Sequence, residues 1–238
     1  MTLIVRNLQL VRDRITTACV SAGRQSGSVC LVAVSKKFGV DAVLQAVSDG
    51  QRVFGENYIA EGVEKITATR AMLPAGIQLE WHCIGPVQSN KTRLVAEHFD
   101  WVQSVDRLKI AERLAEQRPP DLPPLQICIQ VNIDGGATKS GVAPEEAQAL
   151  AQAISSLPRL QLRGLMAIPE PAPDFVAACA LHARAKALFD HINSAGVLPV
   201  AMDTLSIGMT ADLEAAIHAG STMVRVGTAI FGERASRN

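Results

Sequence analysis

The spacing of apolar residues alternates along the chain between two patterns, one typical of strands and one typical of helices. Short apolar runs of roughly four to eight residues, rich in β-branched types, indicate buried strands. Longer segments with apolar residues three and four positions apart indicate helices. The expected strands are 29–34, 52–54, 79–84, 100–104, 125–132, 161–168, 203–207 and 223–226. The expected helices are 3–22, 40–48, 59–72, 89–98, 107–117, 144–156, 175–195 and 211–219.

Eight strands that each lead to a helix or to the chain end are the elements of a (β/α)8 barrel. We therefore predict an α/β fold in which residues 1–238 form a single TIM-type barrel domain with one extra N-terminal helix. No linker or composition break divides the chain. A doubly wound open sheet is the alternative. It usually has fewer strands and a Gly-rich first turn, whereas the first turn here is Ser-Lys-Lys-Phe-Gly.

Composition narrows the possible partners and the compartment. The chain has 23 Lys plus Arg and 23 Asp plus Glu, so its bulk charge favours neither nucleic acid nor an anionic membrane. No apolar run approaches the roughly 20 residues that span a bilayer, and residues 1–14 do not resemble a secretory signal. The five cysteines form no C-x-x-C pair, as expected of buried free thiols. We expect a cytoplasmic protein without nucleic-acid or membrane partners.

Lys36 stands directly after the apolar run 29–35, where the first strand leaves the core. An ammonium at the edge of a low-dielectric interior is desolvated, which favours the neutral amine that attacks aldehydes and ketones to give Schiff bases. A solvated lysine that ends a strand is the alternative interpretation of this segment.

The loops after the last two expected strands have the features of an anion site. Residues 205–210, Leu-Ser-Ile-Gly-Met-Thr, run into a helix for which Thr210 is the expected N-cap. Residues 225–232 contain two further glycines. Glycines and helix N-termini present N–H groups to anions, and barrel enzymes often bind a phosphate in these two loops. An ordinary N-cap with two glycine turns is the alternative.

A phosphate site opposite a Schiff-base lysine is the arrangement that pyridoxal 5′-phosphate (PLP) requires. A sugar-phosphate aldolase needs the same two parts. The five histidines share no metal-ligand spacing, and no Ser-His-Asp or Cys-His arrangement is indicated. Glu56 could orient a group at the site, and we interpret Glu61 as a helix N-terminal acid.

Six segments in order closely resemble the pyridoxal phosphate homeostasis proteins, which are PLP-binding proteins of the alanine racemase N-terminal type with a single (β/α)8 barrel. They are Ala-Val-Ser-Lys (33–36), Phe-Gly-Glu-Asn-Tyr (54–58), Trp-His-Cys-Ile-Gly-Pro-Val-Gln-Ser-Asn-Lys (81–91), Arg-Gly-Leu-Met (163–166), Leu-Ser-Ile-Gly-Met (205–209) and Val-Arg-Val-Gly-Thr-Ala-Ile-Phe-Gly (224–232). The resemblance runs from the first strand nearly to the last residue.

This resemblance implies that Lys36, rather than Lys37, carries PLP as an internal aldimine. It also implies cofactor contacts for eight further residues: Ser206, Gly227 and Thr228 at the phosphate, Gly208 and Met209 in the turn beside it, Arg225 at the pyridine nitrogen, and Asn57 and Met166 around the ring. Lys139 matches a basic position of the family whose role we leave open. The family often has Thr-Lys-Pro after the aldimine lysine, and this chain has Lys37-Phe38-Gly39. That departure puts in doubt any relay through a second lysine at this point.

The same resemblance separates a carrier from an enzyme. A permanently cationic Arg225 disfavours a proton on the pyridine nitrogen and weakens the electron sink. Related racemases use a tyrosine from a separate β domain of a partner subunit as second base, whereas this chain has one tyrosine, Tyr58, and ends soon after the barrel. We therefore expect a monomeric, non-catalytic PLP carrier that supplies PLP-dependent apo-enzymes. A small amino-acid racemase, a Schiff-base aldolase and a pure interaction protein are the alternatives.

Overall fold

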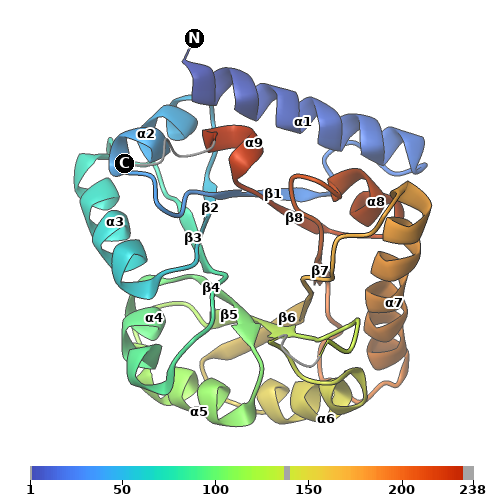
Figure 1. Cartoon of the computed structure of the whole chain (residues 1–238). Coiled ribbons are helices and arrows are strands. Elements are labelled where there is room, and N and C mark those ends of the chain that lie inside the picture. The colour runs from blue at the N-terminus through green and yellow to red at the C-terminus, as the bar shows by residue number, and fades with distance from the viewer. Residues whose placement is uncertain (1, 137–139, 233–238) are drawn as a thin grey trace.

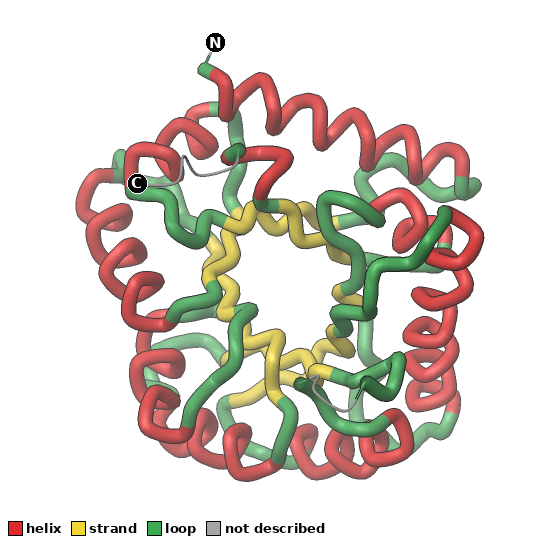
Figure 2. The backbone as a smooth tube through the Cα atoms, in the orientation of Figure 1, coloured by secondary structure: helices red, strands yellow, loops and turns green. Residues whose placement is uncertain are grey.

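Eight parallel strands close into a barrel in the computed structural model, in which strands adjacent in sequence pair and β8 pairs with β1. The strands are β1 (Cys30–Val34), β2 (Val53–Glu56), β3 (Glu80–Cys83), β4 (Trp101–Val105), β5 (Leu125–Gln130), β6 (Leu160–Met166), β7 (Thr204–Ser206) and β8 (Met223–Val226). The structure describes residues 2–136 and 140–232. The predicted (β/α)8 barrel is confirmed, and Figures 1 and 2 show the closed ring of strands inside a ring of helices.

The helices lie outside the ring and alternate with the strands. They are α1 (Leu3–Ser21), α2 (Val40–Ser48), α3 (Ile59–Met72), η1 (Ser89–Lys91), α4 (Thr92–His98), α5 (Leu108–Gln117), α6 (Pro144–Ser155), α7 (Phe175–Ser194), α8 (Leu213–His218) and α9 (Thr228–Phe231). Among the helices, the starts of two differ from the expected ones by two or three residues. The helix expected over 89–98 begins as a separate 3-10 turn, and the helix expected from residue 211 begins at Leu213. Asp212, not Thr210, is therefore the N-cap residue of α8.

The N-terminal helix α1 covers the side of the barrel that the last helix is too short to cover. After β8 the chain forms only the four-residue α9. α1 packs against α2, α8 and α9, and it lies along the outside of β1 and β8 in Figure 1. The Asn7 amide donates a hydrogen bond to the Ile230 carbonyl at 3.1 Å, which ties α1 to α9. The extra helix thus belongs to the outer layer of the barrel.

The apolar core has two parts, because each strand has an outer and an inner face. The larger part lies between the strands and the helices and includes Phe54 and Trp81. The smaller part consists of five buried residues on β1, β4, β5, β6 and β8: Val32, Trp101, Cys128, Met166 and Met223. Since β1 and β4 are not neighbours in the ring, these side chains meet inside the barrel.

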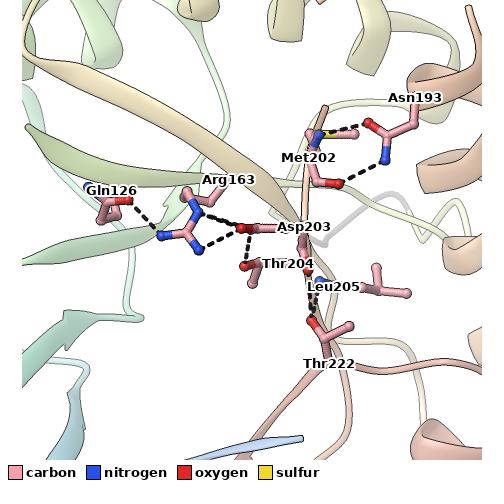
Figure 3. A network of polar contacts seen from close by, with 8 residues as sticks. All are labelled: Gln126, Arg163, Asn193, Met202, Asp203, Thr204, Leu205 and Thr222. Carbon is pink, nitrogen blue, oxygen red and sulfur yellow. Dashed lines mark hydrogen bonds and ion pairs between the residues drawn. The ribbon is translucent and has the colours of Figure 1, made fainter. Parts of the chain in front are cut away.

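Polar contacts connect neighbouring strands near the end of the barrel at which the strands begin (Figure 3). The Arg163 guanidinium forms an ion pair with Asp203 at 2.7 Å, donates to Gln126 at 2.8 Å and lies 4.8 Å from the centre of the Trp101 ring. These contacts link β5 and β6 to the segment that enters β7. In TIM barrels this end serves stability, whereas function lies at the opposite end. Among the described residues, no helix combines the length and the hydropathy needed to cross a membrane.

Candidate functional site

The carboxyl ends of the strands bring most of the predicted site residues to one mouth of the barrel. Lys36 and Thr228 each lie two residues beyond the ends of β1 and β8. These two strands pair directly, with Ala33 opposite Val226. Residues more than 190 positions apart in sequence are therefore neighbours across one strand pair.

Lys36 lies in the turn that follows β1, two residues beyond Val34, the last residue of the strand. Val32, on the same strand, packs inside the barrel. The burial expected from the strand-end position is wrong, because Lys36 is exposed. Its side chain makes no hydrogen bond or ion pair with residues 2–136 or 140–232. The amine is therefore accessible to a ligand at the mouth.

A chain of buried polar side chains crosses the barrel interior below the mouth. The Ser206 hydroxyl donates to Gln103 Oε1 at 2.6 Å and accepts from Arg225 Nη1 at 2.7 Å. Gln103 Nε2 lies 2.7 Å from His82 Nδ1, and His82 Nε2 lies 2.8 Å from Glu80 Oε1. Burial lowers the pKa of His82 although Glu80 opposes this, so the ring is neutral. Nδ1 then accepts from Gln103 while Nε2 donates to Glu80.

Arg225 is the buried cation of this interior. Only 4% of the residue is exposed, and burial lowers the pKa of its guanidinium to about 10. Nη1 also donates to the Ser206 carbonyl at 2.7 Å, and Nη2 donates to the Ala167 carbonyl at 3.1 Å. Two backbone carbonyls and one hydroxyl therefore fix the plane of the guanidinium at the ends of β6 and β7.

Ser206 lies at the end of β7, directly opposite Met166 on β6, and both side chains are fully buried. Its hydroxyl faces the barrel interior and already has two partners. Its contact with a phosphate stays a prediction, as does the contact of Met166 with a ring. Both residues lie at the floor of the mouth.

The loops after β7 and β8 are fastened to each other. The Arg225 N–H donates to the Gly208 carbonyl at 3.0 Å, and the Thr228 and Thr210 hydroxyls lie 3.3 Å apart. Gly208 has a φ of 95°, and a Cβ there would lie 2.5 Å from the Ala216 Cβ, so only glycine fits. Thr228 is exposed and Thr210 is half-buried, so both residues are accessible at this end of the barrel.

Asp212 fixes the β7 loop from outside the mouth. Its Oδ1 accepts from the Met209 N–H at 2.7 Å, and its Oδ2 lies 2.9 Å from His182 Nε2. Burial alone would raise the pKa of the Asp212 carboxyl, but the hydrogen bonds from His182 and Met209 lower it. An ionised Asp212 thus holds Met209, whose side chain is 38% exposed at the rim.

Asn57, after β2, presents an unpaired acceptor. Its Oδ1 is buried, yet it has no hydrogen-bond partner among the described residues. The backbone segments that follow β2 and β3 approach each other closely here, since a Cβ on Gly85 would lie 2.1 Å from the Asn57 carbonyl oxygen. A buried acceptor without a partner costs stability, so Asn57 is suited to a ligand that brings a donor.

Beneath the Lys36 turn lies a buried ion pair. Lys65 Nζ on α3 donates to Glu56 Oε1 at 2.6 Å and to the Ser35 carbonyl at 2.7 Å. The Ser35 hydroxyl donates to the same Glu56 oxygen at 2.6 Å. Burial raises the pKa of Glu56, and Lys65 and Ser35 partly offset this. The residue before Lys36 is therefore held through both its carbonyl and its hydroxyl.

Sequence reasoning missed Gln103 and Lys65. Gln103 and Ser104 are polar residues within the buried strand β4, which was a usable signal for polar contacts inside the fold. Nothing in the sequence indicated that Lys65 is buried, because a lysine on a helix is ordinarily solvated. Lys139 lies outside the described residues.

Comparisons with known proteins agree with this geometry. Residues 7–235 match the family described as alanine racemase, N-terminal domain. The pyridoxal phosphate homeostasis protein of Vibrio cholerae is 54% identical over 231 residues, which cover 97% of this chain and 96% of that protein. This chain belongs to the family of pyridoxal phosphate homeostasis proteins.

Solved structures of similar sequence share the barrel. PipY of Synechococcus elongatus, solved with PLP bound, is 33% identical with a TM-score of 0.82, and the match covers 96% of this chain and all of that one. A protein of Bifidobacterium adolescentis is 34% identical with a TM-score of 0.88, over 96% of this chain and 94% of the other. The family relationship therefore covers the whole barrel, including every loop of the mouth that the structure describes.

Proposed function

We propose that this protein binds PLP at the barrel mouth and acts in intracellular PLP homeostasis as a carrier, without turnover of its own. The observation that carries the proposal is Lys36, exposed and without a partner among the described residues, beside the loops after β7 and β8. Its relatives support the cofactor, since V. cholerae has a protein named for pyridoxal phosphate homeostasis and PipY was solved with PLP.

The residues present fit this cofactor. PLP, when bound, supplies an aldehyde that condenses with an amine and a ring that can accept electrons. Lys36 would provide the amine, and the unpaired Oδ1 of Asn57 would accept from the ring hydroxyl. The Gly208–Met209 turn, Ser206, Gly227 and Thr228 would hold the phosphate. Arg225 would face the ring nitrogen and Met166 would lie below the ring.

Arg225 supports the carrier over the racemase. It is buried, cationic and fixed by Ser206 and Ala167, so it would oppose a proton on the ring nitrogen. The lone tyrosine, Tyr58, is exposed at the rim and is not held by a described partner that would poise it as a base. We further propose a single domain over residues 1–238 and a cytoplasmic monomer that supplies PLP-dependent apo-enzymes.

The direct test is visible absorbance of the purified protein after incubation with PLP and removal of free cofactor. We expect a coloured protein, loss of colour in Lys36→Ala, and retained colour in the matched control Lys37→Ala. A colourless wild-type protein would exclude the proposal.

A second experiment separates carrier from enzyme. The loaded protein is mixed with a PLP-dependent apo-enzyme in the presence of a trap for free PLP, and reactivation is followed. We expect reactivation despite the trap. Chiral analysis of a panel of amino acids should show no inversion beyond the amount of protein, and inversion in excess of it would favour the racemase.

A further inference from the structure

Two lysines stand side by side at the turn after β1, and both are exposed. Lys36 and Lys37 carry the same primary amine, so their chemistry does not distinguish them as partners for an aldehyde. Their backbone geometry does. Lys36 does not have a positive φ, whereas Lys37 has a φ of 67°, in the left-handed region.

The left-handed conformation of Lys37 is unfavourable for a side chain with a Cβ. The turn that imposes it is closed by the Phe38 N–H, which donates to the Ser35 carbonyl at 3.0 Å. The third residue of such a turn is usually glycine or asparagine. A lysine here needs a compensating contact from the surrounding structure.

Glu61 supplies that contact from the first turn of α3. Its Oε1 accepts a hydrogen bond from the Lys37 backbone N–H at 2.6 Å. The same oxygen accepts from Lys65 Nζ at 3.2 Å. A charge-assisted hydrogen bond of this kind is about twice as strong as a neutral one.

Lys65 in turn is fixed on three sides. Its ammonium donates to Glu56, to Glu61 and to the Ser35 carbonyl, which uses all three of its protons. The residues before and after Lys36 are therefore both held by one cluster, while the Lys36 side chain itself is left unbound.

We propose that Glu61, held in place by Lys65, is a positioning residue that selects Lys36 over Lys37 as the amine that binds PLP. This inference rests on the proposed function. In the step concerned, the lysine Nζ forms a bond to the aldehyde carbon and the aldehyde oxygen leaves as water. Glu61 takes no part in that step. It holds the Lys37 backbone in the left-handed conformation and so keeps the Lys37 amine from taking the place of the Lys36 amine.

Without Glu61 the turn loses the contact that offsets the left-handed backbone of Lys37. Lys37 then relaxes toward ordinary negative φ values, and the two adjacent amines exchange roles at the mouth. The consequence is a change in which residue carries the cofactor, with little change in how much cofactor the protein binds.

The test locates the covalent bond in variants of residue 61. Wild type, Glu61→Ala and Glu61→Gln are incubated with PLP and treated with borohydride, which delivers hydride to the former aldehyde carbon while nitrogen takes a proton from water. Peptide mass spectrometry then gives the ratio of label on Lys36 to label on Lys37. Glu64→Ala is the matched control, since Glu64 is an exposed acid on the same helix.

We expect the wild-type label on Lys36 and a fall of about three- to tenfold in the Lys36 to Lys37 ratio for Glu61→Ala, the size of one lost hydrogen bond. Glu61→Gln keeps an oxygen acceptor and should preserve most of the selectivity, as should Glu64→Ala. Circular dichroism verifies that each variant is folded, which is expected because the Glu61 side chain is 36% exposed.

Two results overturn the inference in distinguishable ways. Label that stays on Lys36 alone in folded Glu61→Ala refutes the role of Glu61 and leaves PLP binding intact. Absence of label on both lysines in the wild type refutes PLP binding at this turn, and the selection with it.

Discussion

Arg225 Nη1 donates hydrogen bonds to both the carbonyl oxygen and the hydroxyl oxygen of Ser206, each at 2.7 Å. The two residues lie on adjacent strands, β7 and β8, at the floor of the mouth. The hydroxyl is also bonded to Gln103 on the far side of the barrel, so Ser206 joins the cation to the rest of the interior network.

Ser206→Ala should weaken both the fold and the site. It leaves Gln103 Oε1 without its donor and removes one acceptor of Arg225, at a position where Ser206 and Gln103 are fully buried. We expect a loss of about 1–3 kcal/mol in the free energy of unfolding, measured by urea denaturation. Thr204→Ser on the same strand is the control for general sensitivity of β7. An unchanged midpoint for Ser206→Ala would show that the network does not stabilise the barrel.

Asn57→Ala should lower the affinity for PLP without lowering the stability of the ligand-free protein. Oδ1 of Asn57 is buried without a described partner, so its removal eliminates an unmet acceptor. We expect the unfolding free energy of the ligand-free protein to stay within about 0.5 kcal/mol of wild type or to rise. PLP affinity, measured by spectroscopic titration, should fall about tenfold. Equal losses of stability and affinity would instead mark Asn57 as a structural residue.

Asp212 variants test the support of the β7 loop. Asp212→Ala removes the acceptor of the Met209 N–H, whereas Asp212→Asn keeps one amide oxygen for it. We expect PLP affinity to fall about three- to tenfold in the alanine variant and clearly less in the asparagine variant. Titration of both at equal pH gives the comparison. Equal affinity of the two variants would contradict a role for this hydrogen bond.

The Arg163–Asp203 pair should contribute stability that depends on pH. Burial alone would raise the pKa of Asp203, but hydrogen bonds from Arg163 and Thr204 bring it below its ordinary 3.8. An acid with a depressed folded-state pKa binds fewer protons when folded, so its contribution is present above pH 3.8 and is lost as the pH falls through the folded value.

Asp203→Asn should accordingly be less stable than wild type at pH 7, with the difference shrinking below about pH 4. Thermal unfolding of both proteins between pH 3 and 7 measures it. Because the pair lies at the end of the barrel opposite the mouth, PLP affinity at pH 7 should be unchanged. A constant stability difference across this range would exclude the ion pair as its source.

The sequence by itself determined the fold and the position of the mouth. Hydrophobic period is a local property, and the bounds of α2 and α3 agree with those read from it. Once eight strands are counted, every loop that follows a strand must lie at the same end of the barrel. The places of Lys36 and Thr228 at one mouth follow from that count alone.

The tertiary structure decided how the side chains are bonded. Ser206 and Gln103 are 103 residues apart, and their hydrogen bond exists only because the ring of strands closes and lets β4 and β7 meet across its interior. Lys65 is a second example. The sequence suggests a solvated lysine, but the tertiary structure buries it in an ion pair with Glu56. Local patterns carry no information on contacts that depend on ring closure. Three features are therefore properties of the folded barrel. They are the exposure of Lys36, the hydrogen bond from Ser206 to Gln103 and the hydrogen bond from the Lys37 N–H to Glu61.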